Sequence, residues 1–149
     1  MVDIKKIADL WAVCTYDDCQ MAGQCLRHRV CRELPERWMQ WASVMPSARG
    51  ADGSCRYFQK DEKVMMARGL KSLYNNVHDR HACHELRTAL LQFFGSNGSY
   101  YRYYNGERWM NPELQEQVQK ILRSYGVDDE RPFDEYVEDY DYTVFPMGT

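Results

Sequence analysis

Cysteine is the residue type with the clearest chemistry in this chain. Five of the six cysteines lie within the first 55 residues. Three of them fall within twelve positions, at Cys14, Cys19 and Cys25, and Cys55 follows after a loop-rich stretch. Thiolates bind zinc and iron–sulfur clusters. The clustering therefore predicts a metal that holds the N-terminal segment together.

Structural zinc sites have four ligands at the corners of a tetrahedron. Cys14 and Cys19 flank a predicted turn, and Cys25 lies at the start of a predicted helix. Cys55 reaches the same place if the intervening chain folds back. The spacings differ from the Cys-x2-Cys pairs that indicate zinc most strongly. We predict a structural zinc site whose thiolate ligands are Cys14, Cys19, Cys25 and Cys55.

Two alternatives to zinc use the same cysteines. An iron–sulfur cluster also takes four thiolates and tolerates varied spacing, which would make this a redox protein. His28 lies on the same helix face as Cys25 and could replace one thiol as a ligand. In the other alternative the cysteines stay reduced and bind no metal, because free cysteine is among the most buried residue types.

Signatures of catalysis are weak, although one sequence leaves open an active site assembled from distant residues. The chain has no Gly-x-Ser-x-Gly, no glycine-rich phosphate loop and no His-Glu-x-x-His. Three histidines lie close together in sequence, at His78, His81 and His84. Helix positions three and four apart share a face, so two of these side chains could hold a divalent metal. A solvated helix face explains the same residues more simply, and we expect a protein that is not an enzyme.

A tyrosine-rich segment at 99–110 is the candidate for contact with a partner. Tyr101, Arg102 and Arg108 are the residues that we expect to contact DNA or another partner. Arginine binds phosphate and guanine, and tyrosine stacks on bases. Residues 60–125 hold ten Lys or Arg and seven Asp or Glu, a weaker positive charge than DNA-binding domains usually carry. The alternative is an adaptor protein whose aromatic surface never meets nucleic acid.

A mainly helical fold is expected to position these residues. Apolar side chains recur at helical spacing over 61–75, 80–94 and 112–125. Asn105-Gly106 between aromatic flanks favours one short β-hairpin at 99–110. The same residues also fit a short helix that ends at Asn-Gly. We therefore expect a helical domain with a cysteine-rich N-terminal module.

Composition divides the chain into three parts that form one compact unit. Residues 1–58 are the cysteine-rich module, residues 59–127 the helical core and residues 128–149 an acidic tail. The stretch 128–142 holds eight acidic residues and one arginine. Its apolar residues recur at spacings of three and four, which predicts an amphipathic helix. Such a helix would dock on the body, mask a basic face, or bind a partner protein.

Bulk composition is typical of a globular cytoplasmic protein. The 149 residues are 44% hydrophobic and 28% charged. The N-terminal sequence lacks the apolar region of a signal peptide, and no apolar run is long enough to span a membrane. We expect no membrane partner. In the reducing cytoplasm, cysteines serve more often as ligands or buried thiols than as disulfides.

A series of short motifs resembles a known family. The motifs are Cys14-x4-Cys19-x5-Cys25-Leu-Arg, Cys55-Arg-Tyr-Phe58, Ala67-Arg-Gly69, Tyr100-Tyr-Arg102, Gly106-Glu-Arg108, Pro112-Glu, Gln115 and Phe133-Asp-Glu-Tyr136. Over residues 12–140 this order resembles a small family of uncharacterised bacterial proteins of gut anaerobes, a domain of unknown function. The resemblance implies that the four candidate ligands form a recurring four-cysteine frame. It implies no activity.

A second, shorter resemblance covers residues 86–126. The polar turn Gly95-Ser-Asn-Gly98, the tyrosine–arginine segment, the Asn-Gly stop and the next helix are similar to the recognition-helix end of repressor-type helix-turn-helix proteins. This resemblance implies DNA binding through a helix at 96–104. Taken with the cysteines, it predicts a small binding or regulatory protein that contains a structural zinc.

Overall fold

The computed structural model describes residues 2–8 and 10–143. The chain forms two compact units. Unit 1 comprises the residues up to Glu62 together with the segment from Tyr142, and unit 2 comprises Lys63–Asp141. Each unit has its own apolar core. No helix in the described ranges is long and apolar enough to cross a membrane.

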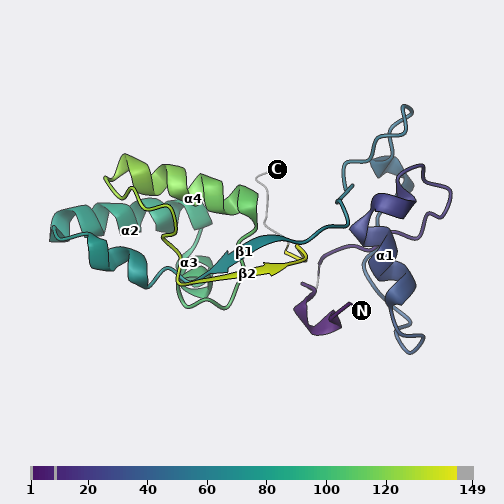
Figure 1. The fold of residues 1–149 in the computed structure, drawn as a ribbon, viewed down its shortest axis with the longest axis horizontal. Helices are drawn as coiled ribbons and strands as arrows, with labels where there is room; N and C mark the ends of the chain where they lie inside the picture. Colours follow the sequence, from purple (N-terminus) through teal and green to yellow (C-terminus); the bar gives the residue numbers. More distant parts are fainter. Residues whose placement is uncertain (1, 9, 144–149) are drawn as a thin grey trace. The chain divides into compact units, whose positions relative to one another are not determined.

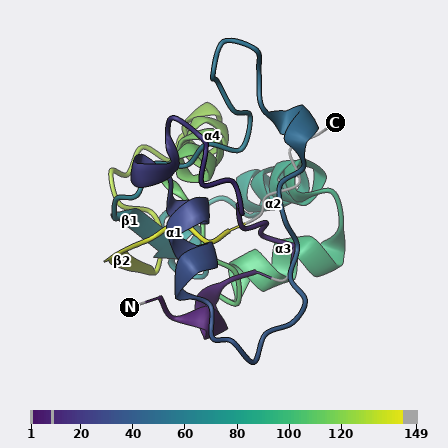
Figure 2. The ribbon, with the colours of Figure 1, turned by 90° about the vertical axis from the view of Figure 1, so that its right-hand side faces the viewer.

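Unit 1 is mostly irregular chain around the helix α1 (Leu26–Glu33) (Figures 1 and 2). Short 3-10 helices lie at Ile4–Lys6, Ala22–Gln24 and Pro46–Ala48. The ring of Tyr142 meets the buried ring of Trp11 edge-on at 5.6 Å. Within the described residues of unit 1, the buried hydrophobic side chains are Ile7, Trp11, Val13, Cys25, Leu26, Val30, Val44 and Tyr142. This is a small core for a unit of this length.

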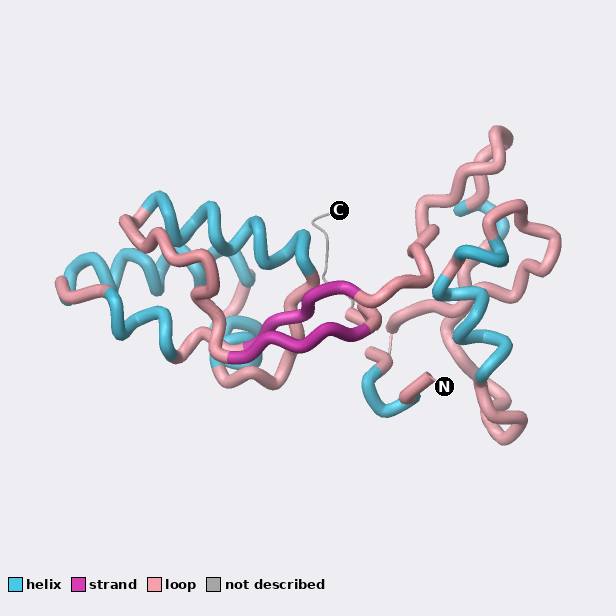
Figure 3. Tube along the Cα trace, in the orientation of Figure 1, coloured by secondary structure: helices cyan, strands magenta, loops and turns pink. Residues whose placement is uncertain are grey.

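Unit 2 contains an antiparallel ribbon of two strands (Figure 3). The strands are β1 (Val64–Arg68) and β2 (Glu135–Asp139). Their register places Met66 opposite Val137 and Arg68 opposite Glu135. The Arg68 guanidinium forms an ion pair with the Glu135 carboxylate at 2.5 Å. The first and last elements of the unit are thereby joined.

Helices make up the rest of unit 2 (Figure 1). They are a 3-10 helix at Ser72–Asn76, α2 (Arg80–Phe94), α3 (Asn97–Tyr104) and α4 (Pro112–Ser124). α2 lies beside both α3 and α4, and α4 also contacts β1. Between these elements lies an apolar core that includes Leu70, Leu73, Leu86, Leu90, Phe94, Tyr100, Tyr103, Leu114, Val118 and Leu122.

Local sequence accounts for the two longer helices. The Asp79 side chain accepts a hydrogen bond from the His81 N–H and so caps α2, which ends at Gly95 with φ of 87°. Asn111 caps α4 in the same way, and Pro112 occupies the first turn, where no N–H is needed. The helices predicted over 80–94 and 112–125 are thus confirmed.

The prediction of a mainly helical fold is wrong, because unit 2 is mixed α/β and unit 1 is largely irregular. The segment 61–75, expected to be one helix, contains β1 and a 3-10 helix. Gly69 lies between them with φ of 85°, a conformation that stops a helix. Spacing alone misled here, because a buried strand with a turn after it can show the same apolar intervals as a helix.

The other two local predictions are also corrected. The acidic stretch 128–142, expected to be an amphipathic helix, contains β2. Its backbone groups pair with β1, a partner far away in sequence that periodicity does not reveal. The hairpin predicted at 99–110 is wrong as well: α3 covers its first part, and Gly106, with φ of 77°, lies in the turn that follows. The alternative, a short helix that ends at Asn-Gly, is the correct one.

Candidate functional site

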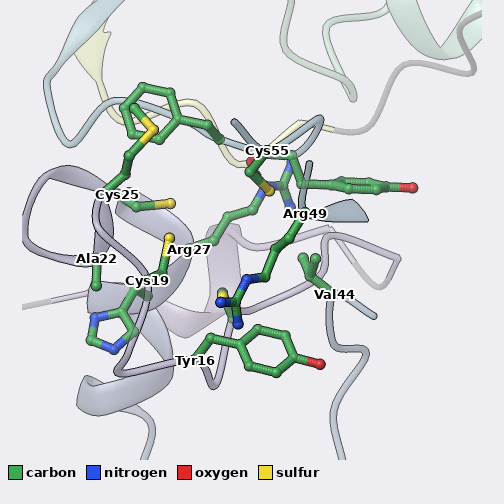
Figure 4. Close-up of a pocket in the computed structure, with 13 residues that line it drawn as sticks. Tyr16, Cys19, Ala22, Cys25, Arg27, Val44, Arg49 and Cys55 are labelled. Carbon is green, nitrogen blue, oxygen red and sulfur yellow. Dashed lines mark hydrogen bonds between the residues drawn. The ribbon is translucent and has the colours of Figure 1, made fainter. Parts of the chain in front are cut away.

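The four predicted ligands share one cavity in unit 1 (Figure 4). Cys14, Cys19, Cys25 and Cys55 all line it, and its volume is about 20 Å³. A space of that size holds about one water molecule or one ion. Other lining residues include Tyr16, Arg27, His28, Arg49 and Tyr57. Cysteines up to 41 positions apart in sequence (14 to 55) thus meet at one small hollow.

Backbone hydrogen bonds hold the first two cysteines in place. The Cys14 N–H donates to the Arg27 carbonyl oxygen at 3.1 Å. The preceding residue, Val13, forms an isolated bridge with Ser43. Cys19 lies at a turn, because its N–H donates to the Tyr16 carbonyl at 3.4 Å. Both cysteines are therefore fixed by main-chain contacts that leave their thiols available.

The last two cysteines lie at equally well-defined positions. Cys25 immediately precedes α1, has an extended backbone, and makes no side-chain capping hydrogen bond. An isolated bridge joins Cys25 to Lys60, and another joins Cys55 to Arg49. Cys25 is buried, whereas the other three ligand candidates are partly exposed. Figure 4 shows the Cys19, Cys25 and Cys55 side chains around the same hollow.

The thiols are close enough to influence one another electrostatically. Burial raises the pKa of the Cys14 thiol, and the backbone N–H of Tyr16, which hydrogen-bonds to the sulfur, partly offsets that rise in pKa. Negative charge on Cys25, Cys19 or Cys55 raises the pKa of Cys14 further. Burial and the neighbouring thiols thus both favour the protonated form of Cys14.

Two arginines flank the thiols, and sequence reasoning missed both. The Arg27 guanidinium donates to the carbonyl oxygens of Ala12 at 2.7 Å and Tyr57 at 2.8 Å, and lies 4.5 Å from the centre of the Trp11 ring. The place of Arg27 in the Cys25-Leu-Arg motif was the available signal. No comparable motif marks Arg49.

Arg49 carries its charge beside Cys19. Its guanidinium forms an ion pair with Asp18 at 3.2 Å and lies 4.8 Å from the centre of the Tyr16 ring. The hydrogen bond to Asp18 raises the pKa of Arg49, and the nearby Cys19 acts in the same direction. Positive charge is therefore available next to the thiols.

His28 also lines the cavity, as its position after Cys25 suggested. The residue is buried, with 6% of its surface exposed, and its Nε2 lies 2.8 Å from Asp17 Oδ1. A carboxylate partner on one ring nitrogen is common for histidines that bind a metal through the other. His28 is thus a fifth potential donor at this site.

The donors do not form a preassembled ligand set. Across residues 2–8 and 10–143, no group of three or more His, Cys, Asp or Glu side chains is arranged so that it could hold a metal ion. The four cysteines line one cavity, but their side chains would have to turn toward a bound ion in order to coordinate it. Zinc–sulfur bonds are about 2.3 Å long.

Two of the three predicted contact residues are joined through the main chain of unit 2, because the Arg108 N–H donates to the Arg102 carbonyl oxygen at 3.3 Å. Tyr101 is exposed and accepts a hydrogen bond from Arg87. Arg102 is exposed on the same helix, whereas the Arg108 guanidinium lies 5.8 Å from the centre of the Tyr103 ring. Contact of these residues with DNA or a partner protein stays a prediction, as does a partner for the acidic stretch 128–142.

The remaining cysteines differ in their surroundings: burial raises the pKa of the Cys31 thiol and negative charge on the nearby Cys14 raises it further, whereas Cys83 lies in unit 2. His81 pairs with Glu85 at 3.1 Å on the exposed face of α2. The Cys83 thiol donates to the Val77 carbonyl at 3.4 Å. Cys31 is partly exposed and does not line the cysteine cavity.

An irregular unit arranged around a thiol-lined cavity, followed by a mixed α/β unit, defines a small cysteine-rich protein. A model of a family of unknown function, DUF6078, matches residues 1–142, and the chain belongs to this family. The prediction that the chain belongs to a family of unknown function is thereby confirmed. No curated protein and no solved structure matches the chain.

Proposed function

We propose that unit 1 binds one zinc ion through the thiolates of Cys14, Cys19, Cys25 and Cys55, and that the ion stabilises the fold of this unit. The observation that carries the proposal is that all four thiols line one cavity. The protein as a whole would then be a small binding or regulatory protein with a structural metal.

The architecture of unit 1 gives a physical reason for a metal. Its regular structure is one eight-residue α-helix and three short 3-10 helices in the described residues. A unit of about 70 residues buries too little apolar surface to be very stable on its own. Small domains of this kind often gain their stability from disulfides or zinc. All six cysteines are free, so disulfides do not supply that stability here.

Charge around the cavity fits a tetrathiolate site. Zinc with four thiolates carries a net charge of about −2, which is costly to bury unless cations lie nearby. Arg27 and Arg49 both line the cavity as cations, and Arg49 is also paired with Asp18. The Tyr16 N–H already donates to the Cys14 sulfur. Hydrogen bonds of this kind orient a ligand sulfur and lower its charge density.

Zinc content after purification without oxygen or chelators tests the proposal. We expect about one zinc per chain, and loss of that zinc in the Cys55→Ser variant. Cys83→Ser is the matched control, because Cys83 lies in unit 2 and contacts Val77. Full zinc content in Cys55→Ser, or no zinc in the wild type, would refute the tetrathiolate site. Stoichiometric iron and sulfide in the purified protein would indicate that the cysteines bind an iron–sulfur cluster and not zinc.

A further inference from the structure

Unit 2 contains a second hollow, which is lined by aromatic rings. Its volume is about 250 Å³, and its lining residues are Tyr74, Arg87, Tyr100, Tyr101 and Tyr104. They come from three elements: the 3-10 helix at Ser72–Asn76, α2 and α3. The hollow lies wholly within unit 2 and shares no residue with the cysteine cavity. It is therefore independent of the proposed zinc site.

The tyrosine rings provide surfaces for a flat ligand. Tyr100 and Tyr104 are stacked, with ring centres 5.8 Å apart and planes inclined by 26°. The Tyr101 ring stands nearly perpendicular to that of Tyr104, at 84°. Aromatic rings attract other rings in stacked and edge-on arrangements alike. A planar ring placed in this hollow can stack on one tyrosine ring and contact another edge-on.

The hydroxyl groups offer hydrogen bonds beyond those used inside the protein. The Tyr74 and Tyr100 hydroxyls lie 2.6 Å apart, so one donates to the other and the accepting hydroxyl keeps its own O–H for a ligand. The Tyr104 hydroxyl forms no hydrogen bond within the described part of the chain. Burial raises the pKa of both Tyr74 and Tyr100, so both hydroxyls keep their protons well above neutral pH.

Arg87 supplies the charge of the hollow. Its guanidinium donates to the Tyr101 hydroxyl and lies 5.6 Å from the centre of that ring. Within residues 2–8 and 10–143 it forms no ion pair with a carboxylate. Its positive charge also acts on Tyr74 and Tyr100. A guanidinium without a carboxylate partner, beside hydroxyl donors, attracts an anion and repels a cation.

We propose that this hollow binds a small aromatic carboxylate, with its ring against the tyrosines and its carboxylate on the Arg87 guanidinium. One guanidinium balances one negative charge, which favours a monoanion over the dianion of a phosphate ester. The volume lies just below the range of about 300–1,000 Å³ typical of pockets for drug-sized ligands, so the ligand has about one ring. Guanidinium groups match the planar carboxylate geometrically.

Titration of the full-length protein with benzoate, followed by NMR of its tyrosine rings, tests this site. We expect the ring signals of Tyr101 and Tyr104 to shift with saturable dependence on benzoate. Benzyl alcohol has the ring without the charge, and cyclohexanecarboxylate has the charge without the aromatic ring. Both are expected to bind about tenfold more weakly or worse, because each lacks half of the interaction.

Two matched variants locate the charge that binds benzoate. Arg87→Gln should weaken binding about tenfold or more, because it removes a charge-assisted hydrogen bond. Arg80→Gln, at an exposed arginine of α2 that does not line the hollow, should leave binding unchanged. No saturable shift with benzoate, equal binding of benzyl alcohol, or equal weakening by both variants would overturn the proposal. Stronger binding of phenyl phosphate than of benzoate would overturn the choice of a carboxylate.

Discussion

The backbone N–H of Asp134 donates a hydrogen bond to the carbonyl oxygen of Gly69 at 3.1 Å. Gly69 has φ of 85°, and the position that a β-carbon would occupy on it is filled by the Asp134 carboxylate. These residues belong to two of the sequence motifs, Ala67-Arg-Gly69 and Phe133-Asp-Glu-Tyr136. Their contact joins the end of β1 to the start of β2.

Gly69→Ala should destabilise unit 2 by about 2 kcal/mol or more, because it adds strain at positive φ and a clash with Asp134. Gly98→Ala is the control, since Gly98 lies in α3 with open space around it. Alanine there should be neutral or stabilise by up to about 1 kcal/mol. Urea unfolding of the full chain measures both changes. Equal stability of the two variants would contradict the contact.

Asp134→Ala should also destabilise unit 2, by about 1–2 kcal/mol. The Asp134 carboxylate accepts hydrogen bonds from the Lys71 N–H at 3.0 Å, the Ser72 N–H at 2.8 Å and the Ser72 hydroxyl at 2.5 Å. Glu130→Ala removes an exposed acid from the same acidic stretch and should change little. If both variants lost the same stability, the effect would come from net charge.

Arg27→Lys should destabilise unit 1 by about 1–2 kcal/mol. A lysine ammonium keeps the charge but cannot reproduce the two directed hydrogen bonds to Ala12 and Tyr57 together with the flat contact on Trp11. The control is Arg32→Lys, at an exposed position in the last turn of α1. Thermal unfolding followed by tryptophan fluorescence compares the variants. If Arg27→Lys unfolded at the same temperature as the wild type, only the charge of Arg27 would contribute to stability.

Stability should fall as pH rises above about 10, the ordinary pKa of tyrosine. Burial and the hydrogen bond to Tyr100 raise the pKa of Tyr74 in the folded state. Above pH 10 the unfolded chain therefore releases the Tyr74 proton first, and stability that is complete at lower pH is lost.

Tyr74→Phe removes that titration, so the free energy of unfolding should fall less steeply between about pH 9 and about pH 11. Urea unfolding at several pH values measures the slope. Tyr100, Tyr103 and Tyr136 contribute to the remaining slope, because burial also raises their pKa values. An unchanged slope in Tyr74→Phe would show that this hydroxyl titrates alike in the folded and unfolded chain.

Local signals predicted α2 and α4 because caps and terminators stand next to each helix in sequence. Asp79 and Gly95 bracket α2, and Asn111 and Pro112 begin α4. The ribbon β1–β2 was missed because its hydrogen-bonding partners are about 70 residues apart, as Arg68 and Glu135 show. Nothing local to either strand identifies that partner.

The cysteines were predictable as a group because their residue type and clustering are unusual, although their positions around the cavity depend on distant backbone contacts. Cys14, for example, is held by the Arg27 carbonyl. The aromatic hollow escaped prediction because Arg87 and Tyr74 are distant in sequence from the tyrosines of α3. Which of the exposed arginines lies beside those rings is decided by the three-dimensional structure.

Cobalt(II) substitution tests the central claim most directly, because thiolate ligands give tetrahedral cobalt intense charge-transfer absorption whose strength grows with their number. We predict a spectrum typical of four thiolates for the wild type and for His28→Ala. Variants with Ser at Cys14, Cys19, Cys25 or Cys55 should each lose intensity. Absence of the charge-transfer bands, or their loss in His28→Ala with full intensity in Cys55→Ser, would contradict the four-thiolate site.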